Sequence, residues 1–478
     1  PIQYLLTYPY GCVEQTASGV IGLAAVRGLV QKKLITGVEV GQVDGYLKRG
    51  LGRLLNLQTT SGGFAYWPGH SYAHGWGSVY AVAALTLART QGLEVPEVSL
   101  QRSVKFLRDR AYDRKISLRE RAFITYLLAL NQALPAEVYR AMVRDFPRLD
   151  REGKVLVLLA GHEARLRAPG ELKLYLKPIL EGKDQSKDEV VEEDFDARYR
   201  GPALTLMAAQ AIMPEDPGTR QAALYLLGGL GREGIWTSTS DTGWALLALG
   251  EYFKGAGFSQ EAGEITISQG SGPPRQLALE TTSPRSLALD VQTLLQNPVV
   301  RLQGKAGRTW LYQVDLVYPR LDLKTQAAAQ GFKVSKTIRN TDGTDTIRVG
   351  DMVKVSVQVE LPRGQRYVVL DDPLPAGLVA INSAFKTEQP TPEGEEAEYF
   401  DYLMADGTLR FRPNYFEIRE DRVLAFRDVV YPGSYRFEYY ARAVCEGSFV
   451  LPSAKAEAMY SPGLQGFTAQ GRLTVKGR

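Results

Sequence analysis

Near the start of this 478-residue chain, a cysteine stands three residues before a glutamine, in the segment YPYGCVEQT at residues 8–16. An apolar run with helical spacing follows at once, so the segment predicts the first turn of a helix. At this separation the Cys12 and Gln15 side chains share one helix face. The Cys12 thiol can therefore attack the Gln15 carboxamide carbon, expel ammonia and close an internal thioester.

The position at a helix start favours this chemistry. The partial positive charge of a helix N-terminus favours thiolate over thiol. Pro9 suits a tight turn into the helix, and Gly11 lets the backbone bend where a side chain would obstruct it. The product would be a stored acyl group, inert while buried and ready to acylate a nucleophile once exposed. A bare Cys-x-x-Gln is more often a buried cysteine at a helix start, so the prediction depends on the longer motif.

That longer motif closely resembles the thioester motif of bacterial alpha-2-macroglobulins, which are relatives of the complement thioester proteins. The resemblance implies that Cys12 and Gln15 form the cross-link and that Gly11 and Glu14 support it. In the family a protease cleaves a bait region, the molecule rearranges, and a lysine of the protease attacks the exposed thioester. The resemblance thus implies a single-turnover protease inhibitor that is not an enzyme, with target proteases as its partners.

Length and composition restrict the other possibilities. A chain of 478 residues is too long for one core and predicts about three domains. Its 44% apolar and 23% charged residues are typical of a folded protein. The net charge of +4 is small for this length and argues against a dedicated nucleic-acid surface. No apolar run is long enough to span a bilayer, and no cofactor or metal is expected.

Helical spacing recurs through the first half of the chain, with short Gly-, Pro- or Asp-containing connections. Eleven helices in succession without a strand predict a closed alpha/alpha toroid, the fold of the thioester domain in the family. Glycine–aromatic turns at 62–67 and 234–236 support internal repetition. The predicted helices are 15–30, 41–55, 78–89, 100–112, 119–130, 136–146, 153–165, 171–180, 202–213, 219–229 and 240–253.

Several conspicuous side chains in this half are expected to be structural. The aromatic residues at the two turns are expected to anchor the core rather than contact a ligand. Asp241 is expected to cap the helix that it opens. The acidic run at 188–194 is expected to be a solvated loop rather than a metal site.

After residue 257 the pattern changes to strands. Alternating segments at 264–268 and 309–317 predict half-buried strands. In the family the toroid is inserted into a small β domain of the CUB type, so this stretch is expected to be the C-terminal half of that domain. The period-two segment 353–359 and the apolar segment 367–370 predict an antiparallel sandwich, which resembles the C-terminal macroglobulin domain.

The predicted fold is therefore a multidomain α + β protein. The thioester-domain toroid is expected at 1–257, the half CUB-like β domain at 258–322 and the receptor-binding-like macroglobulin sandwich at 323–478. The resemblance implies that N-terminal macroglobulin and bait domains of a longer protein precede this segment. It also implies a protein that is periplasmic or anchored to the inner membrane on its periplasmic side.

A latent thioester has to be kept from water. Tyr8 and Tyr10 flank Cys12 closely enough for a ring to cover the sulfur. The resemblance implies that Met459 and Tyr460, in the C-terminal domain, supply the rest of the shield; the alternative is that Met459 fills the sandwich core. The second cysteine, Cys445, is expected to be a small buried side chain, and no disulfide framework is expected.

Other classes of function remain open. An opsonin- or adhesin-like module would use the same thioester to attach to surfaces, and a passive binding module would carry it already hydrolysed. Toroid enzymes of the terpene cyclase or prenyltransferase type need an Asp-rich cluster or zinc held by Asp, Cys and His. A cysteine hydrolase or transglutaminase would pair Cys12 with a histidine.

The three histidines decide between some of these classes. His70, His74 and His162 show no ligand spacing with Cys12, and no Cys/His motif of a hydrolase is visible. Complement relatives that prefer hydroxyl acceptors use a toroid histidine to attack the thioester first. His162 does not resemble that site, and His70 and His74 lie in a loop near the Gly-Gly-Phe turn. We therefore expect direct transfer to amines, with little preference for hydroxyls.

Overall fold

The structure is a computed structural model that forms two compact units, Pro1–Asp315 and Leu316–Arg478. It describes all residues except 9, 34, 36, 187–194, 196, 232–233, 256–262, 271, 280–286, 305–311, 313, 315–325, 382–403, 405, 462 and 478. The acidic run at 188–194 and most of the strand predicted at 309–317 lie outside the described residues. So do the boundaries expected after residues 257 and 322, and the division into three domains therefore stays a prediction.

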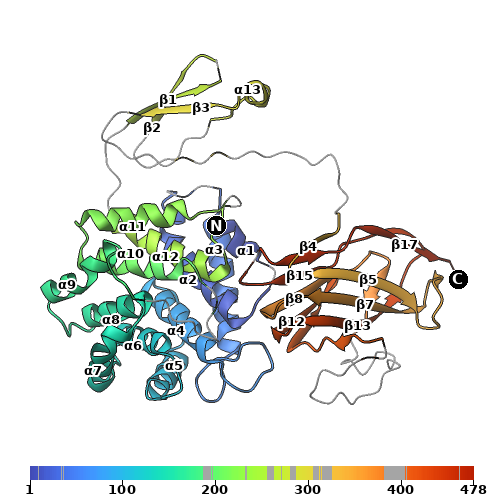
Figure 1. The fold of residues 1–478 in the computed structure, drawn as a ribbon, viewed down its shortest axis with the longest axis horizontal. Coiled ribbons are helices and arrows are strands. Elements are labelled where there is room, and N and C mark those ends of the chain that lie inside the picture. Colours follow the sequence, from blue (N-terminus) through green and yellow to red (C-terminus); the bar gives the residue numbers. More distant parts are fainter. Residues whose placement is uncertain are drawn as a thin grey trace. The chain divides into compact units, whose positions relative to one another are not determined.

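Among the described residues, six helices form a closed inner ring in the first unit. Each contacts the next in the order α2, α4, α6, α8, α10 and α12, and α12 returns to α2. Nearly every residue of α2 and α4 is buried, as a helix covered on all sides requires. The inner helices are α2 (Val13–Gln31), α4 (Gly75–Thr90), α6 (Leu118–Leu130), α8 (Arg151–Glu163), α10 (Arg200–Ile212) and α12 (Thr239–Gly255) (Figure 1).

The helices that alternate with these cover the ring from outside. They are amphipathic: on α7, for example, Val138, Tyr139 and Met142 are buried while the charged residues face outwards. The outer helices are α3 (Val40–Asn56), α5 (Glu97–Arg110), α7 (Ala136–Asp145), α9 (Pro169–Leu180) and α11 (Pro217–Gly228). All eleven predicted helices are present, and the predicted alpha/alpha toroid is confirmed.

Three short helical segments were not predicted. They are α1 (Ile2–Thr7), α13 (Val291–Gln296) and the 3₁₀ turn Phe146–Arg148. None is long enough to show a hydrophobic period. The first of them contacts α2, α3 and α12, so it packs beside the helix that carries the cysteine motif.

Helices α2 and α12 approach closely because glycine stands at their crossing. A side-chain carbon at Gly243 would clash with the Ser18 carbonyl oxygen. We expect Gly243→Ala to lower the free energy of unfolding by about 1–3 kcal/mol, because the two backbones would have to separate. The control is Gly28→Ala on α2, where the added carbon meets nothing within 4 Å and helix propensity predicts a gain of up to about 1 kcal/mol. Urea denaturation measures both, and equal stability of the two variants would contradict this account.

A small antiparallel sheet follows the toroid in the chain, with the order β2-β1-β3. Its strands are β1 (Gly263–Gln269), β2 (Arg275–Leu279) and β3 (Val300–Gly304). The strand predicted at 264–268 is confirmed by β1. None of the described residues in these three strands is fully buried. The assignment of this stretch to a CUB-like domain stays a prediction.

The second unit is a β-sandwich. Its two larger sheets have the orders β10-β13-β7-β5, with β9 beside β13, and β11-β12-β8-β15-β16-β4; a third sheet is β14-β17-β6. Most pairs are antiparallel, but β10 with β13 and β17 with β6 are parallel. The strands are β4 (Ala328–Gln330), β5 (Lys333–Asn340), β6 (Ile347–Arg348), β7 (Met352–Leu361), β8 (Gln365–Pro373), β9 (Leu378–Ala380), β10 (Leu409–Arg410), β11 (Tyr415–Ile418), β12 (Arg422–Val430), β13 (Gly433–Ala443), β14 (Gly447–Leu451), β15 (Lys455–Ala458), β16 (Gln465–Phe467) and β17 (Gly471–Lys476).

Two strands show why the sandwich forms. Alternate residues of β7 are buried, as its period-two sequence predicts, while β8 has an unbroken buried run at its centre. The two strands predicted at 353–359 and 367–370 are therefore confirmed. A buried ion pair also links the two sheets: Lys336 Nζ lies 2.5 Å from Asp372 Oδ1, and the Tyr439 hydroxyl donates to Asp372 Oδ2 at 2.7 Å.

The expectation for Cys445 was wrong. Strand β13 ends at Ala443, and Cys445 lies in the connection to β14, exposed to solvent. The flanking sequence is strand-like, but no sheet face covers this position. Cys12, by contrast, is buried.

Candidate functional site

Cys12 and Gln15 meet at the N-terminus of α2. Cys12 is the N-cap residue, and the exposed fractions of the two residues are 0% and 2%. The Cys12 sulfur accepts a hydrogen bond from the Gln15 backbone N–H at 3.5 Å. In return Gln15 Oε1 accepts one from the Cys12 backbone N–H at 3.2 Å. This is a capping box in which a sulfur replaces the usual hydroxyl, and it holds the two groups predicted to react on one side of the helix.

Tyr8 lies at the other end of the Gln15 carboxamide. Gln15 Nε2 donates to the Tyr8 hydroxyl at 3.5 Å. The Tyr8 ring stands edge-on to Tyr4 and Tyr10, with ring centres 5.2 and 5.4 Å away. The structure therefore places Tyr8 beside the nitrogen that would leave as ammonia, a contact that the sequence spacing does not reveal.

The backbone before α2 is fixed by two neighbours. Arg53 Nε donates to the Gly11 carbonyl oxygen at 2.8 Å, and the Val13 N–H donates to the Tyr66 carbonyl oxygen at 3.1 Å. A side-chain carbon at Gly11 would lie only 2.8 Å from the Arg53 guanidinium carbon. A larger residue at position 11 would therefore displace the Arg53 guanidinium that holds this backbone; Gly11 is not among the glycines with positive φ.

Glu14 turns into the toroid and is completely buried. Its carboxylate accepts hydrogen bonds from the Ser18 hydroxyl at 2.6 Å and from the Thr239 hydroxyl at 3.0 Å. Burial, together with the Glu14 charge, raises the pKa of Tyr46 to about 12. The bond to Thr239 joins the cysteine motif to α12.

The histidines lie in three different surroundings. His74 is the N-cap of α4: its Nδ1 accepts from the Gly77 N–H at 2.9 Å, and its ring lies 5.0 Å from that of Tyr66. The His70 ring stacks on that of Tyr72 with centres 5.7 Å apart. His162 lies in the last turn of α8. No described cluster of three or more His, Cys, Asp or Glu side chains could hold a metal ion.

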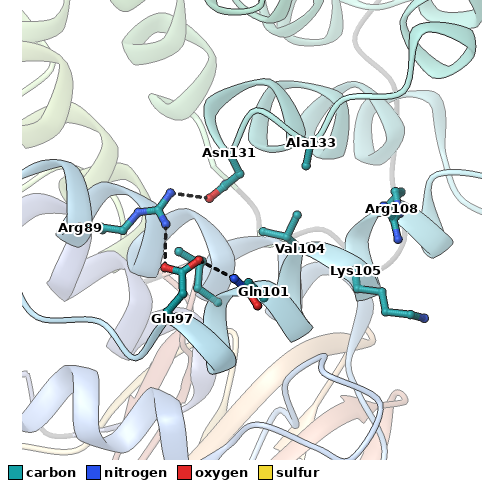
Figure 2. A pocket seen from close by; sticks show the side chains of 9 residues that line it. Arg89, Glu97, Gln101, Val104, Lys105, Arg108, Asn131 and Ala133 are labelled. Atoms are coloured by element: carbon teal, nitrogen blue, oxygen red, sulfur yellow. Dashed lines mark hydrogen bonds and ion pairs between the residues drawn. The ribbon is translucent and has the colours of Figure 1, made fainter.

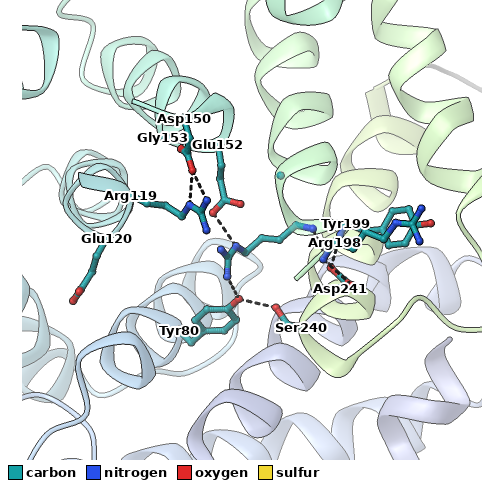
Figure 3. A network of polar contacts seen from close by, with 12 residues as sticks. Tyr80, Arg119, Glu120, Asp150, Glu152, Gly153, Arg198, Tyr199, Ser240 and Asp241 are labelled. Atoms are coloured by element: carbon teal, nitrogen blue, oxygen red, sulfur yellow. Dashed lines mark hydrogen bonds and ion pairs between the residues drawn. The ribbon is translucent and has the colours of Figure 1, made fainter. Parts of the chain in front are cut away.

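A polar network fills the centre of the toroid (Figure 3). Arg200, with 1% of its surface exposed, pairs with Glu152 at 2.9 Å and donates to the Tyr80 hydroxyl at 2.7 Å. That hydroxyl also shares a hydrogen bond with Ser240 at 2.6 Å. The guanidinium lies over the Trp76 ring at 5.3 Å, so this charge is enclosed by aromatic side chains.

Asp241 was expected to cap the helix that it opens, α12, and this expectation was wrong. Its carboxylate accepts hydrogen bonds from the backbone N–H groups of Arg198, Tyr199 and Arg200, at 3.2, 2.6 and 3.1 Å. It therefore caps α10, not α12, in whose first turn it stands. The aromatic anchors were predicted correctly, since Phe64, Trp67, Trp76, Trp236 and Trp244 are all buried.

A surface pocket of about 290 Å³ lies between α4, α5 and the turn after α6 (Figure 2). Within it Arg89 is paired with Glu97 at 3.3 Å and donates to Asn131 at 3.2 Å. Neither Cys12 nor Gln15 lines this pocket, so it is separate from the predicted reactive pair. None of the described helices has the length and apolar character needed to cross a membrane.

Met459 and Tyr460 follow β15 in the second unit. Each is 6% exposed, yet neither belongs to the buried cluster that forms the sandwich core. The Met459 N–H donates to the Tyr367 carbonyl oxygen at 3.0 Å, and the Tyr460 ring is edge-on to that of Tyr367 at 5.1 Å. Both the shielding of the thioester and the alternative, a packing role for Met459, stay predictions.

Comparison with protein families finds two domain models. Residues 1–125 match the A-macroglobulin TED domain, and residues 331–463 match the bacterial alpha-2-macroglobulin MG10 domain. The alpha-2-macroglobulin of Escherichia coli K12 is 25% identical over 96% of this chain, and the Nostoc homologue is 24% identical over 89%. The alignments span 28% and 23% of those longer relatives.

Solved structures show the same fold. Salmonella alpha-2-macroglobulin reacted with methylamine has a TM-score of 0.73 and 23% identity, over 99% of this chain and 30% of its own. The native conformation of the Escherichia coli protein also has a TM-score of 0.73, with 21% identity and the same coverage. Because a thioester-domain match, a bacterial macroglobulin-domain match and nearly full-length alignments agree, the chain belongs to the bacterial alpha-2-macroglobulin family.

Proposed function

We propose that this chain stores an internal thioester between Cys12 and Gln15, and that the longer protein uses it to capture proteases covalently. In the first step the sulfur attacks the Gln15 carboxamide carbon, and the thiol proton leaves with the nitrogen as ammonia. In the second, a lysine amine of the protease attacks the same carbon, an amide forms and the Cys12 thiolate is released. The acyl group is consumed, so the capture is a single turnover and not catalysis.

The capping box is the observation that supports this proposal best. It aligns the Cys12 sulfur and the Gln15 carboxamide before any bond forms. Because the two groups are already oriented, the reaction avoids much of the entropic cost of bringing them together. The Cys12 backbone N–H points at Gln15 Oε1, where negative charge develops when the sulfur attacks. The burial of both groups suits a thioester that has to be kept from water.

Intact mass tests the proposal directly. Native chain should weigh one ammonia less than its sequence, and Cys12 should resist alkylation under native conditions. Methylamine, with which the Salmonella relative was reacted, should free the thiol and leave a methylamide on Gln15. A freely alkylatable Cys12 in protein whose mass excludes earlier hydrolysis would overturn the proposal.

The acceptor should be an amine rather than a hydroxyl. His74 already uses Nδ1 to cap α4. The His70 ring stacks on Tyr72, and His162 lies in the last turn of α8. We therefore expect no acyl-imidazole intermediate. Competition between methylamine and glycerol should give almost only the amide. Efficient glycerol ester that disappears in one of His70→Ala, His74→Ala or His162→Ala would show that a histidine does take part.

The shielding residues should control the lifetime of the thioester. Removal of an aromatic or thioether cover admits water. Tyr8→Ala and Met459→Ala should therefore speed thioester loss at least about tenfold without unfolding the protein. A tenfold change corresponds to about 1.4 kcal/mol in the activation free energy of hydrolysis. Tyr8→Phe is the matched control, because it keeps the ring and removes only the hydroxyl near Gln15 Nε2. The measurement is the mass of the native chain during incubation at neutral pH. Unchanged loss rates in both alanine variants would reject the shield.

From the family resemblance we also propose a periplasmic location, as a free protein or held at the inner membrane. Cell fractionation of the full-length protein tests it. Recovery in the cytosolic fraction would refute it.

A further inference from the structure

Three consecutive residues at the start of α12 hold three different helices. Thr239 donates to Glu14 of α2, Ser240 bonds to Tyr80 of α4 at 2.6 Å, and Asp241 accepts from the backbone at the start of α10. Figure 3 shows the last two of these contacts. The first turn of α12 is therefore a junction through which the reactive helix is tied to the centre of the toroid.

The contact between Thr239 and Glu14 joins positions 225 residues apart in sequence. Both residues are buried, with 2% and 0% of their surfaces exposed. Glu14 also accepts from Ser18, but Ser18 stands on the same helix and cannot fix the rotation of α2 against its neighbours. A donor on α12 can, because a turn of α2 about its axis would withdraw the carboxylate from that donor.

The rotation of this first turn decides where the reactive groups point. Glu14 lies between Cys12 and Gln15 in sequence, and successive helix residues differ in direction by a fixed angle. Holding Glu14 inwards therefore fixes the directions of the other two side chains. Gly243 allows α12 to approach α2 closely one turn further on, which keeps the Thr239 hydroxyl within reach.

From this geometry we propose that Thr239 is a positioning residue for the thioester: its hydroxyl holds Glu14 and thereby keeps the Cys12 sulfur and the Gln15 carboxamide in register. The inference rests on the proposed function and adds a residue to it. Thr239 itself does not touch the reacting atoms; it acts through Glu14.

The test compares three variants of the full 478-residue chain. Thr239→Val keeps the shape of the side chain and removes the hydroxyl, and Thr239→Ser restores it. Thr242→Val is the matched control, because Thr242 is buried on the same helix and its hydroxyl has no hydrogen-bond partner in the described part of the structure. For each, intact mass gives the fraction carrying the thioester, and alkylation gives the rate at which the Cys12 thiol reacts after methylamine treatment.

We expect Thr239→Val to lower the thioester fraction at least about fivefold and to speed alkylation of the released thiol by a similar factor, as loss of one hydrogen bond to a charged group would. Thr239→Ser and Thr242→Val should match wild type. In a Glu14→Leu background, Thr239→Val should add little, because leucine offers the Thr239 hydroxyl no acceptor and both changes therefore break the same contact.

Other outcomes overturn the proposal. It fails if Thr239→Val matches Thr242→Val in both measurements, or if Thr239→Ser does not restore them while circular dichroism shows a folded toroid. A wild-type chain without any mass deficit would count against the proposed function instead. In that case the alkylation rate of the free Cys12 thiol still decides for or against the positioning role.

Discussion

Replacing Cys12 by serine is expected to abolish methylamine incorporation into this chain completely. An alcohol is a far weaker nucleophile than a thiolate at neutral pH, so the carboxamide of Gln15 would stay intact. The fold should not suffer, because serine is a preferred N-cap residue and can take over the hydrogen bond that the sulfur accepts from the Gln15 N–H. Gln15→Asn should abolish incorporation as well, since the shorter side chain withdraws the carboxamide carbon from the sulfur.

Cys445→Ser is the control for this experiment. Cys445 is an exposed free thiol far along the sequence, and its loss should leave methylamine incorporation at the wild-type level. Peptide mapping after reaction locates the methylamide, which should appear on Gln15 alone. Incorporation that persists in Cys12→Ser, or that falls equally in Cys445→Ser, would contradict the assignment of the cross-link to Cys12 and Gln15.

Arg200→Met is expected to lower the free energy of unfolding of the toroid by about 3–5 kcal/mol, because it removes one partner of a buried ion pair, the cation that lies 2.9 Å from Glu152. The hydroxyl of Tyr80 would lose a donor at the same time. A double variant, Arg200→Met with Glu152→Leu, should recover most of the loss, since an apolar pair of similar volume replaces the ion pair without a buried charge.

The matched control is Arg27→Met, which breaks a partly exposed ion pair with Asp44 in the same toroid. Solvent screens that pair, so we expect a cost below about 1 kcal/mol. Urea denaturation followed by far-UV circular dichroism measures all three variants. If Arg200→Met costs no more than Arg27→Met, the buried network contributes nothing particular to the stability of the toroid.

The sequence alone determined the local structure of this protein. The eleven helices were predictable because each is an apolar or amphipathic run of helical length between short Gly-, Pro- or Asp-containing connections. Strand β7 was predictable because its apolar and polar residues alternate with a period of two. The pairing of Cys12 with Gln15 belongs to the same class, since residues three apart on a helix are neighbours whatever surrounds them. The residues of the motif around them were also sufficient to indicate the family.

Only the tertiary structure decided the contacts between distant segments. No sequence spacing indicates that Thr239 reaches Glu14, or that Asp241 caps α10 rather than its own helix. The exposure of Cys445 has the same origin. Each depends on which helix or sheet face packs against the residue, and that is set by closure of the toroid and of the sandwich rather than by the residues next to it in the chain.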